Sequence, residues 1–183
     1  MKQNKVTIEQ FHIPRWKELP NVDLYLDQVV NLINSTLSPY IYMNNDYKKE
    51  NNQLLTKTMI NNYVKNNLIE APIKKLYSKI QLAKLFVICV LKQVYSMQDI
   101  QILINLALTY SSIEVSYDRF CDLFEEALVC TFNRKDFINE NNSEAMYLLK
   151  SVLLSCSYKI YVENVTEKEK ENENIEETKK AKL

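Results

Sequence analysis

Two short polar stretches in the first half of the chain carry side chains suited to contacting a nucleic acid. The first places lysine, threonine and asparagine between apolar positions, at Lys57, Thr58, Asn61, Asn62 and Lys65. The second follows at Lys74, Lys75 and Tyr77. Lysine ammonium groups neutralise phosphates, and an asparagine amide can pair with both N6 and N7 of adenine. We therefore expect phosphate contacts from the lysines and Tyr77, and base recognition by the asparagines.

The first stretch is predicted to lie on a helix from about Thr56 to Asn66. Thr56 can cap its N-terminus. Apolar side chains then recur at helical spacing, at Met59, Ile60, Tyr63 and Val64. This spacing leaves the lysines and asparagines on the outer face of the helix, where they could enter a groove.

The end of this helix is predicted from the absence of glycine. Because the chain contains no glycine, Asn67 is expected to take the left-handed conformation that follows a helix C-terminus. Pro72 then forbids helix at Ala71. The residues at 74–77 would form a very short wing or extended arm, and Ser78 with Gln81 forms a capping box that opens the next helix.

This order of features is similar to the N-terminal DNA-binding domain of the MerR family. That family has a recognition helix ending in a glycine-leucine-leucine turn, then a proline, a wing and a tyrosine-serine pair that opens a helix. Leu68, Ile69, Pro72, Tyr77 and Ser78 stand in the corresponding places. The resemblance implies a helix-turn-helix with a short wing and a double-stranded DNA partner.

A closer resemblance covers roughly residues 11 to 160. The segments PRW (14–16), LYLDQV (24–29), LTKTMINNYVK (55–65) and KKLYS (74–78) occur in this order. The chain thereby resembles a bacterial family of low-GC Gram-positive organisms, catalogued as domain of unknown function 1836. This resemblance implies a fold but no established activity.

Several departures from the MerR pattern change what that resemblance implies. Thr58 and Asn61 stand where the family's recognition helix usually presents arginines, so any base preference must differ. Asn67 replaces a glycine, and the wing is shorter. The first helix of the motif would be 22–37, some eighteen residues before the second instead of a tight turn away.

Composition predicts one all-α domain of about six helices. A chain of 183 residues with 46% hydrophobic content can bury one sizeable core. We expect an N-terminal arm at 1–18, the helix-turn-helix region at 19–110 and a C-terminal helical pair at 111–162. Residues 163–183 are almost wholly Glu, Lys, Asn and Thr, and are predicted to be a disordered tail or an extension of the sixth helix.

The apolar patterns give approximate bounds for these helices. Five of them are expected at about 21–36, 56–66, 79–94, 117–132 and 143–161, and a further helix is expected to begin at 97. The helix at 79–94 is apolar almost all round and should be central. Within the arm, Phe11, Ile13 and Trp16 are predicted to pin the chain across the core.

Charge is unevenly distributed although the formal net charge is zero. Nine lysines and three acids fall between residues 44 and 92, so this segment carries +6, whereas the segment from residue 93 carries −6. A positive centre that coincides with the helix-turn-helix candidate fits phosphate contact. The alternative is that these lysines only solvate exposed helical faces.

Cysteine and histidine usage argues against a metal site. Cys89, Cys121, Cys130 and Cys156 stand alone in apolar patterns, with no paired spacing, and the only histidine is His12. We expect core cysteines in a reducing cytoplasm, with no cofactor. The N-terminus has no apolar secretion signal, and the longest apolar run, 85–91, is far too short to span a bilayer.

No enzyme is expected. Without glycine the chain cannot form the phosphate-binding loops of nucleotide enzymes. Asp118, Asp122, Glu125 and Glu126 could form an acidic strip, but a solvated helix face is the more common arrangement. The leading hypothesis is therefore a MerR-like DNA-binding transcription regulator, and the alternative is a helical module for protein partners or self-association. A homodimer is compatible with the resemblance but does not follow from it, because two medium helices replace the long dimerising helix of MerR proteins.

Overall fold

The computed structural model describes residues 8–41, 53–137 and 143–180, and within its last helix it describes no side chain at 168 or at 171–180. The described residues start with a short 3-10 helix and include six α-helices. The N-terminal elements are η1 (Ile8–Gln10), β1 (Leu24–Tyr25), α1 (Leu26–Leu37), α2 (Lys57–Lys65) and β2 (Leu76–Tyr77). The remaining helices are α3 (Lys79–Leu91), α4 (Met97–Tyr110), α5 (Ile113–Phe132) and α6 (Glu144–Lys180). The predicted all-α fold is confirmed.

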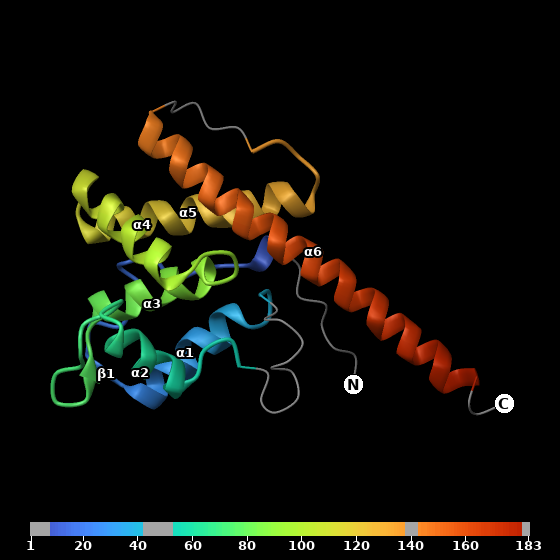
Figure 1. Ribbon diagram of the computed structural model, residues 1–183, viewed down its shortest axis with the longest axis horizontal. Helices are drawn as coiled ribbons and strands as arrows, with labels where there is room; N and C mark the ends of the chain where they lie inside the picture. Colours follow the sequence, from blue (N-terminus) through green and yellow to red (C-terminus); the bar gives the residue numbers. More distant parts are fainter. Residues whose placement is uncertain (1–7, 42–52, 138–142, 181–183) are drawn as a thin grey trace.

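Helix α3 is the centre of the molecule, as its apolar sequence predicts. Nine of its thirteen residues are buried, including Leu85, Phe86 and Ile88 at 0% exposure. It lies between α1 and α2 on one side and α4, α5 and α6 on the other (Figure 1). Burial on all sides explains why α3 shows no polar face.

The first helix begins later than predicted. The pattern suggested a start near residue 21, but Leu24 and Tyr25 form strand β1, which pairs antiparallel with β2. Val22, expected on the apolar stripe, is 69% exposed because it precedes the helix. From there the stripe is correct, since Val29, Val30, Ile33 and Leu37 are all buried.

The N-terminal arm crosses the core as predicted. Phe11 is 5% exposed and Ile13 is fully buried, and the Phe11 ring meets Tyr40 and Phe124 edge-on at 4.8 and 5.8 Å. Trp16 packs against Tyr117 with ring centroids 6.5 Å apart. The arm therefore joins helices from opposite ends of the sequence.

Helix α5 starts one turn earlier than predicted because Ser112 caps it, accepting a hydrogen bond from the Val115 N–H. Helix α6 packs along α5 and then extends beyond the body (Figure 1). It continues through 163–180, the segment for which the sequence left a disordered tail or a helical extension open. Glutamate and lysine favour helix, and the pairs Lys159–Glu163 and Glu167–Lys170 are spaced to support it.

The four cysteines differ in burial. Cys89, Cys121 and Cys156 are buried, and burial raises the pKa of each thiol to about 12. Cys130 is only partly buried, although burial raises its pKa as well. Because the thiolate is the nucleophile, we expect N-ethylmaleimide at pH 8 to label Cys130 alone in the native protein and all four in denaturant. Mass spectrometry of a time course measures this, and equally fast labelling of Cys89 would show that the core opens.

Candidate nucleic-acid interface

Helix α2 presents the predicted polar face. Thr56 caps it, with its Oγ1 accepting a hydrogen bond from the Met59 N–H at 3.2 Å. Ile60 and Tyr63 are buried at 0% and 3% exposure and hold the helix on the core. The five candidate side chains are all exposed: Lys57, Thr58, Asn61, Asn62 and Lys65.

The C-terminus of α2 is closed by Asn67, as predicted from the absence of glycine. Asn67 has a φ of 57°, in the left-handed region. Its N–H donates to the Val64 carbonyl at 3.0 Å, and the Leu68 N–H donates to the Tyr63 carbonyl at 2.9 Å. These two bonds form a Schellman motif. Leu68 is 3% exposed, so the motif returns the chain to the core and fixes the orientation of α2.

A tight turn follows at Lys74 and Lys75. Ile73 and Leu76 exchange two backbone hydrogen bonds, of 3.1 and 2.9 Å, around this two-residue loop. Lys74 and Lys75 have φ values of 50° and 68°. Positive φ at both central residues is the geometry of a type I′ hairpin turn, which normally uses asparagine and glycine. Each lysine in this left-handed conformation lowers the stability of the fold by about 1–2 kcal/mol. The turn therefore holds two exposed charges on a strained backbone.

The predicted wing or extended arm is thus a β-hairpin. Strand β2 leads from the turn and pairs with β1, with Leu24 opposite Tyr77 and Tyr25 opposite Leu76. On the side of β2 away from β1, Leu76 also forms an antiparallel bridge with Ile73, across the turn. Directly opposed residues share a face of a sheet, so Tyr25, Leu76 and Ile73 form an apolar row beside the lysine turn. Tyr25 is 59% and Ile73 is 76% exposed.

Tyr77 is the one residue predicted to contact DNA whose side chain is buried. Its side chain is 3% exposed, and burial raises the pKa of its phenol. Successive side chains on a strand point to opposite faces, so Leu76 faces outward and Tyr77 packs inward. The expected contact between Tyr77 and a phosphate was wrong for this reason.

Polar contacts tie the turn and α2 to the central helix. The predicted capping box is confirmed, with the Ser78 N–H donating to Gln81 Oε1 at 2.7 Å. Gln81 is buried, and its Nε2 donates to the Glu70 carbonyl at 2.8 Å. The Glu70 carboxylate accepts from Lys84 Nζ at 2.5 Å. Burial raises the pKa of Glu70, but its hydrogen bonds, that from Lys84 foremost, lower it by more.

The lysines of this region divide into paired and unpaired side chains. Lys57 forms an ion pair with Asp27 of α1, and Lys84 pairs with Glu70. Lys79 donates to Asn21 at 3.0 Å and lies 5.1 Å from the Trp16 ring. Lys65, Lys74 and Lys75 are exposed and have no acidic partner within the described part of the chain. The lysines at 48 and 49 lie outside the described residues.

The two asparagines of α2 are not equivalent. Asn62 Oδ1 accepts from Asn66 Nδ2 at 2.9 Å, while Asn66 Nδ2 also reaches the Asn62 carbonyl at 2.8 Å. Asn61 forms no such contact among the described side chains and is exposed. Asn61 is therefore the freer of the two to present both its donor and its acceptor to a base edge.

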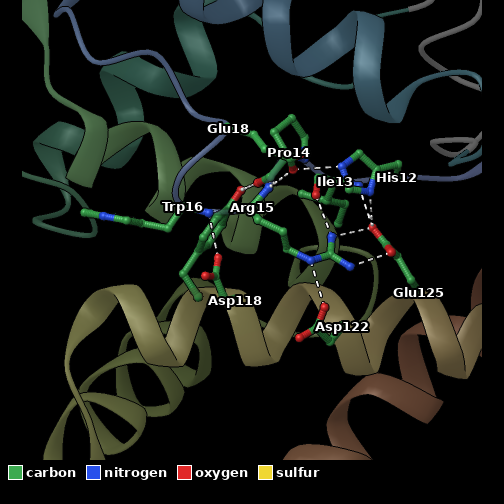
Figure 2. A network of polar contacts seen from close by, with 10 residues as sticks. His12, Ile13, Pro14, Arg15, Trp16, Glu18, Asp118, Asp122 and Glu125 are labelled. Atoms are coloured by element: carbon green, nitrogen blue, oxygen red, sulfur yellow. Dashed lines mark hydrogen bonds and ion pairs between the residues drawn. The ribbon is translucent and has the colours of Figure 1, made fainter.

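A second polar cluster, which the sequence did not predict, binds the arm to α5 (Figure 2). Arg15 Nη1 and Nη2 donate to the two carboxylate oxygens of Glu125, each at 2.6 Å, and Arg15 Nε donates to Asp122 at 2.8 Å. The Trp16 N–H donates to Asp118 at 2.6 Å. Hydrogen bonding to Glu125 is the main cause of the raised pKa of Arg15.

This arrangement, which we call the Arg15 clamp, consists of Arg15, Trp16, Asp118, Asp122 and Glu125. The Glu125 carboxylate also accepts from the Ile13 N–H at 2.6 Å (Figure 2). The acidic strip was interpreted as a solvated face, but three of its four carboxylates bind the arm. All of these contacts join residues more than one hundred positions apart, which is why sequence spacing gave no signal for them.

Comparison with known protein families gives one match. Residues 14–120 match the family model described as Domain of unknown function (DUF1836). This range begins at the residue before Arg15 and includes α1 to α4 with the first part of α5. No curated protein and no solved structure matches.

Two further features are absent from the described residues. No group of three or more histidine, cysteine, aspartate or glutamate side chains in this part of the chain could hold a metal ion. None of the described helices is long and apolar enough to cross a lipid bilayer.

Proposed function

Since the chain belongs to the DUF1836 family, whose description states no activity, we propose a function from its surface: a DNA-binding transcription regulator of MerR-like type. In this proposal α2 enters the major groove, and the turn at Lys74 and Lys75 contacts the phosphate backbone as a wing. Lys65 contacts a phosphate, Lys57 stands at the start of the same face in an ion pair with Asp27, and Asn61, with Thr58 and Asn62, faces the base edges.

One observation carries the proposal: three exposed lysines on α2 and the hairpin turn have no acidic partner among the described residues. An unpaired ammonium group keeps its full charge available to a phosphate. The loop that joins this helix to the turn is held to α3 at Glu70, by Gln81 and Lys84. The three lysines are therefore presented on rigid elements, as recognition requires.

The order of elements supports the same proposal. Helices α1 and α2, the hairpin and helix α3 follow one another in the order that the MerR resemblance implies. The helix α2 and the hairpin lie on the same side of the molecule (Figure 1). A convex helix beside a strand turn is the general shape of a winged DNA-binding surface.

The proposal is tested by fluorescence anisotropy of the full chain with a labelled AT-containing duplex, titrated at several salt concentrations. Three phosphate contacts predict a slope of log K against log salt of about −2.7. Absence of binding at low salt, or binding that does not respond to salt, would overturn the proposal.

Either outcome would favour an interaction module instead. A specific observation supports this alternative: helix α4 leaves Ile102, Leu108 and Tyr110 exposed at 64%, 38% and 64%. Exposed apolar side chains that lie close together mark protein contact surfaces.

Replacing Asp27 with asparagine is expected to strengthen DNA binding. The Asp27 carboxylate neutralises Lys57 at the start of α2 and would repel a phosphate there. Its removal should free one ammonium group, which makes the salt slope steeper by about 0.9 and raises affinity by roughly three- to eightfold at 0.1 M salt. The same anisotropy titration measures both quantities.

Asp23→Asn is the matched control for this variant. Asp23 is exposed, lies four residues away and forms no ion pair among the described side chains. The Asp23→Asn substitution removes the same charge without releasing a lysine, so the salt slope of this variant should equal that of the unmodified chain. An equal gain in both variants would mean that Lys57 does not reach a phosphate.

A further inference from the structure

An open apolar groove lies between α4, α5 and the first turns of α6, with α3 as its floor. Its volume is about 270 Å³. Aliphatic side chains from three helices form its walls: Val87, Leu91, Leu103, Ile104, Leu149 and Val152. It is separate from the lysines of α2 and the hairpin, none of which lines it.

The groove exists because α4 is apolar but poorly covered. Among its fourteen residues only Asp99 is charged, yet only Ile100 is buried. Leu108 and Leu148, on opposite walls of the groove, each remain 38% exposed. Water in such a groove is replaced favourably by an apolar chain, since the hydrophobic effect scales with the apolar area removed from solvent.

The charges of the groove have one sign. Lys84 and Arg119 line it, and none of its lining residues is aspartate or glutamate. Lys84 already binds Glu70 at 2.5 Å. Arg119 is exposed and has no hydrogen bond or ion pair to another described residue, so its guanidinium is the charge available to a ligand.

Hydroxyl groups accompany Arg119 at this edge. Ser116 lies one turn before Arg119 on α5, and its Oγ is 2.8 Å from the Ser111 Oγ. Both serines line the groove. A guanidinium with neighbouring hydroxyls suits a carboxylate, because arginine can donate two parallel hydrogen bonds to its oxygens.

We propose that this groove binds a small amphipathic carboxylate of the medium-chain fatty acid class. The acyl chain lies against the aliphatic walls, and the carboxylate binds Arg119 and the hydroxyl pair of Ser111 and Ser116. The groove volume corresponds to about nine water molecules at ~30 Å³ each, which fits a chain of about ten carbon atoms. This binding does not depend on whether the protein binds DNA.

The test uses isothermal titration calorimetry of the full chain with decanoate and with 1-decanol, both below the concentrations at which they aggregate. Decanoate should bind about tenfold more tightly than the alcohol, because only its head group forms a charge-assisted pair. In Arg119→Gln the two probes should bind alike. Arg134→Gln, an exposed substitution beyond the end of the same helix, should keep the tenfold preference.

A second variant tests the location. Ala107 is exposed and lines the groove, so Ala107→Trp fills it without disturbing the core and should abolish binding of both probes. Equal binding of decanoate and decanol to the unmodified chain would overturn the carboxylate assignment, and unchanged binding to Ala107→Trp would overturn the site. Sedimentation that shows a dimer, which Ala107→Trp dissociates while neither probe binds, would overturn the proposal in favour of a second copy as the occupant.

Discussion

Replacing Lys74 with asparagine and Lys75 with glycine is expected to stabilise the protein and weaken its DNA binding at the same time. Asparagine and glycine are the preferred residues of a type I′ turn, and both central positions have positive φ here. Glycine removes the strain at position 75 and asparagine only reduces it at position 74, while glycine also adds freedom to the unfolded chain, so the free energy of unfolding should rise by about 1–2 kcal/mol. Urea denaturation measures this change.

The same double substitution removes two of the three unpaired ammonium groups. If both contact phosphates, the slope of log K against log salt should fall by about 1.8, and affinity at 0.1 M salt should fall by between about tenfold and a hundredfold. Because stability rises, weaker binding cannot be attributed to unfolding. A variant that is more stable and binds DNA unchanged would contradict the role of the hairpin as a wing.

A matched control exists at the other end of the molecule. Arg134 has a φ of 55° and follows the C-terminus of α5, where Lys135 donates its N–H to the Cys130 carbonyl at 2.8 Å. Arg134→Gly with Lys135→Asn also removes two charges and relieves one strained residue. The C-terminus of α5, which these residues follow, lies away from α2 (Figure 1), so this variant should leave the salt slope and the affinity nearly unchanged.

Replacing Arg15 with methionine is expected to destabilise the fold by about 3 kcal/mol. Methionine keeps the apolar length of the side chain but loses the hydrogen bonds to Glu125, Asp122 and the Ile13 carbonyl. Glu125, 18% exposed, would retain its charge without its main partner. Urea denaturation followed by circular dichroism measures the loss.

Lys17→Met is the control for this substitution. Lys17 lies two residues away in the same arm, is exposed and has no polar contact among the described residues, so its replacement should change stability by less than about 0.5 kcal/mol. In a double-mutant cycle, Glu125→Gln should cost much less when Arg15 is already methionine. Strictly additive effects would show that the two side chains do not act as a pair.

Local signals in the sequence predicted local structure well. Thr56, Asn67 and Ser78 mark the two ends of α2 and the start of α3, and each acts through bonds to residues no more than five positions away. Such bonds depend on residue type and spacing alone. The helix predicted at about 117–132 lies within α5, and Tyr117, Phe124 and Leu128 on it are buried, because a single buried face repeats every turn.

Contacts between distant segments were not predictable in this way. The inward face of Tyr77 depends on its pairing with Leu24, and the Arg15 clamp depends on α5 lying beside the arm. Lys57 was predicted to be available, yet Asp27 from α1 pairs with it. The exposure of α4 could likewise not be predicted, because its apolar sequence is the same whether or not another helix covers it.

The Arg15 clamp also sets an order of events during synthesis on the ribosome. Arg15 leaves the ribosome 110 residues before Glu125, a delay of roughly 5–20 s at 5–20 residues per second. Throughout that time the emerging arm and the helices up to α4 lack the carboxylates that hold the arm in place. The arm can therefore take its final place only after α5 has been translated, which makes its placement depend on residues made more than one hundred positions later.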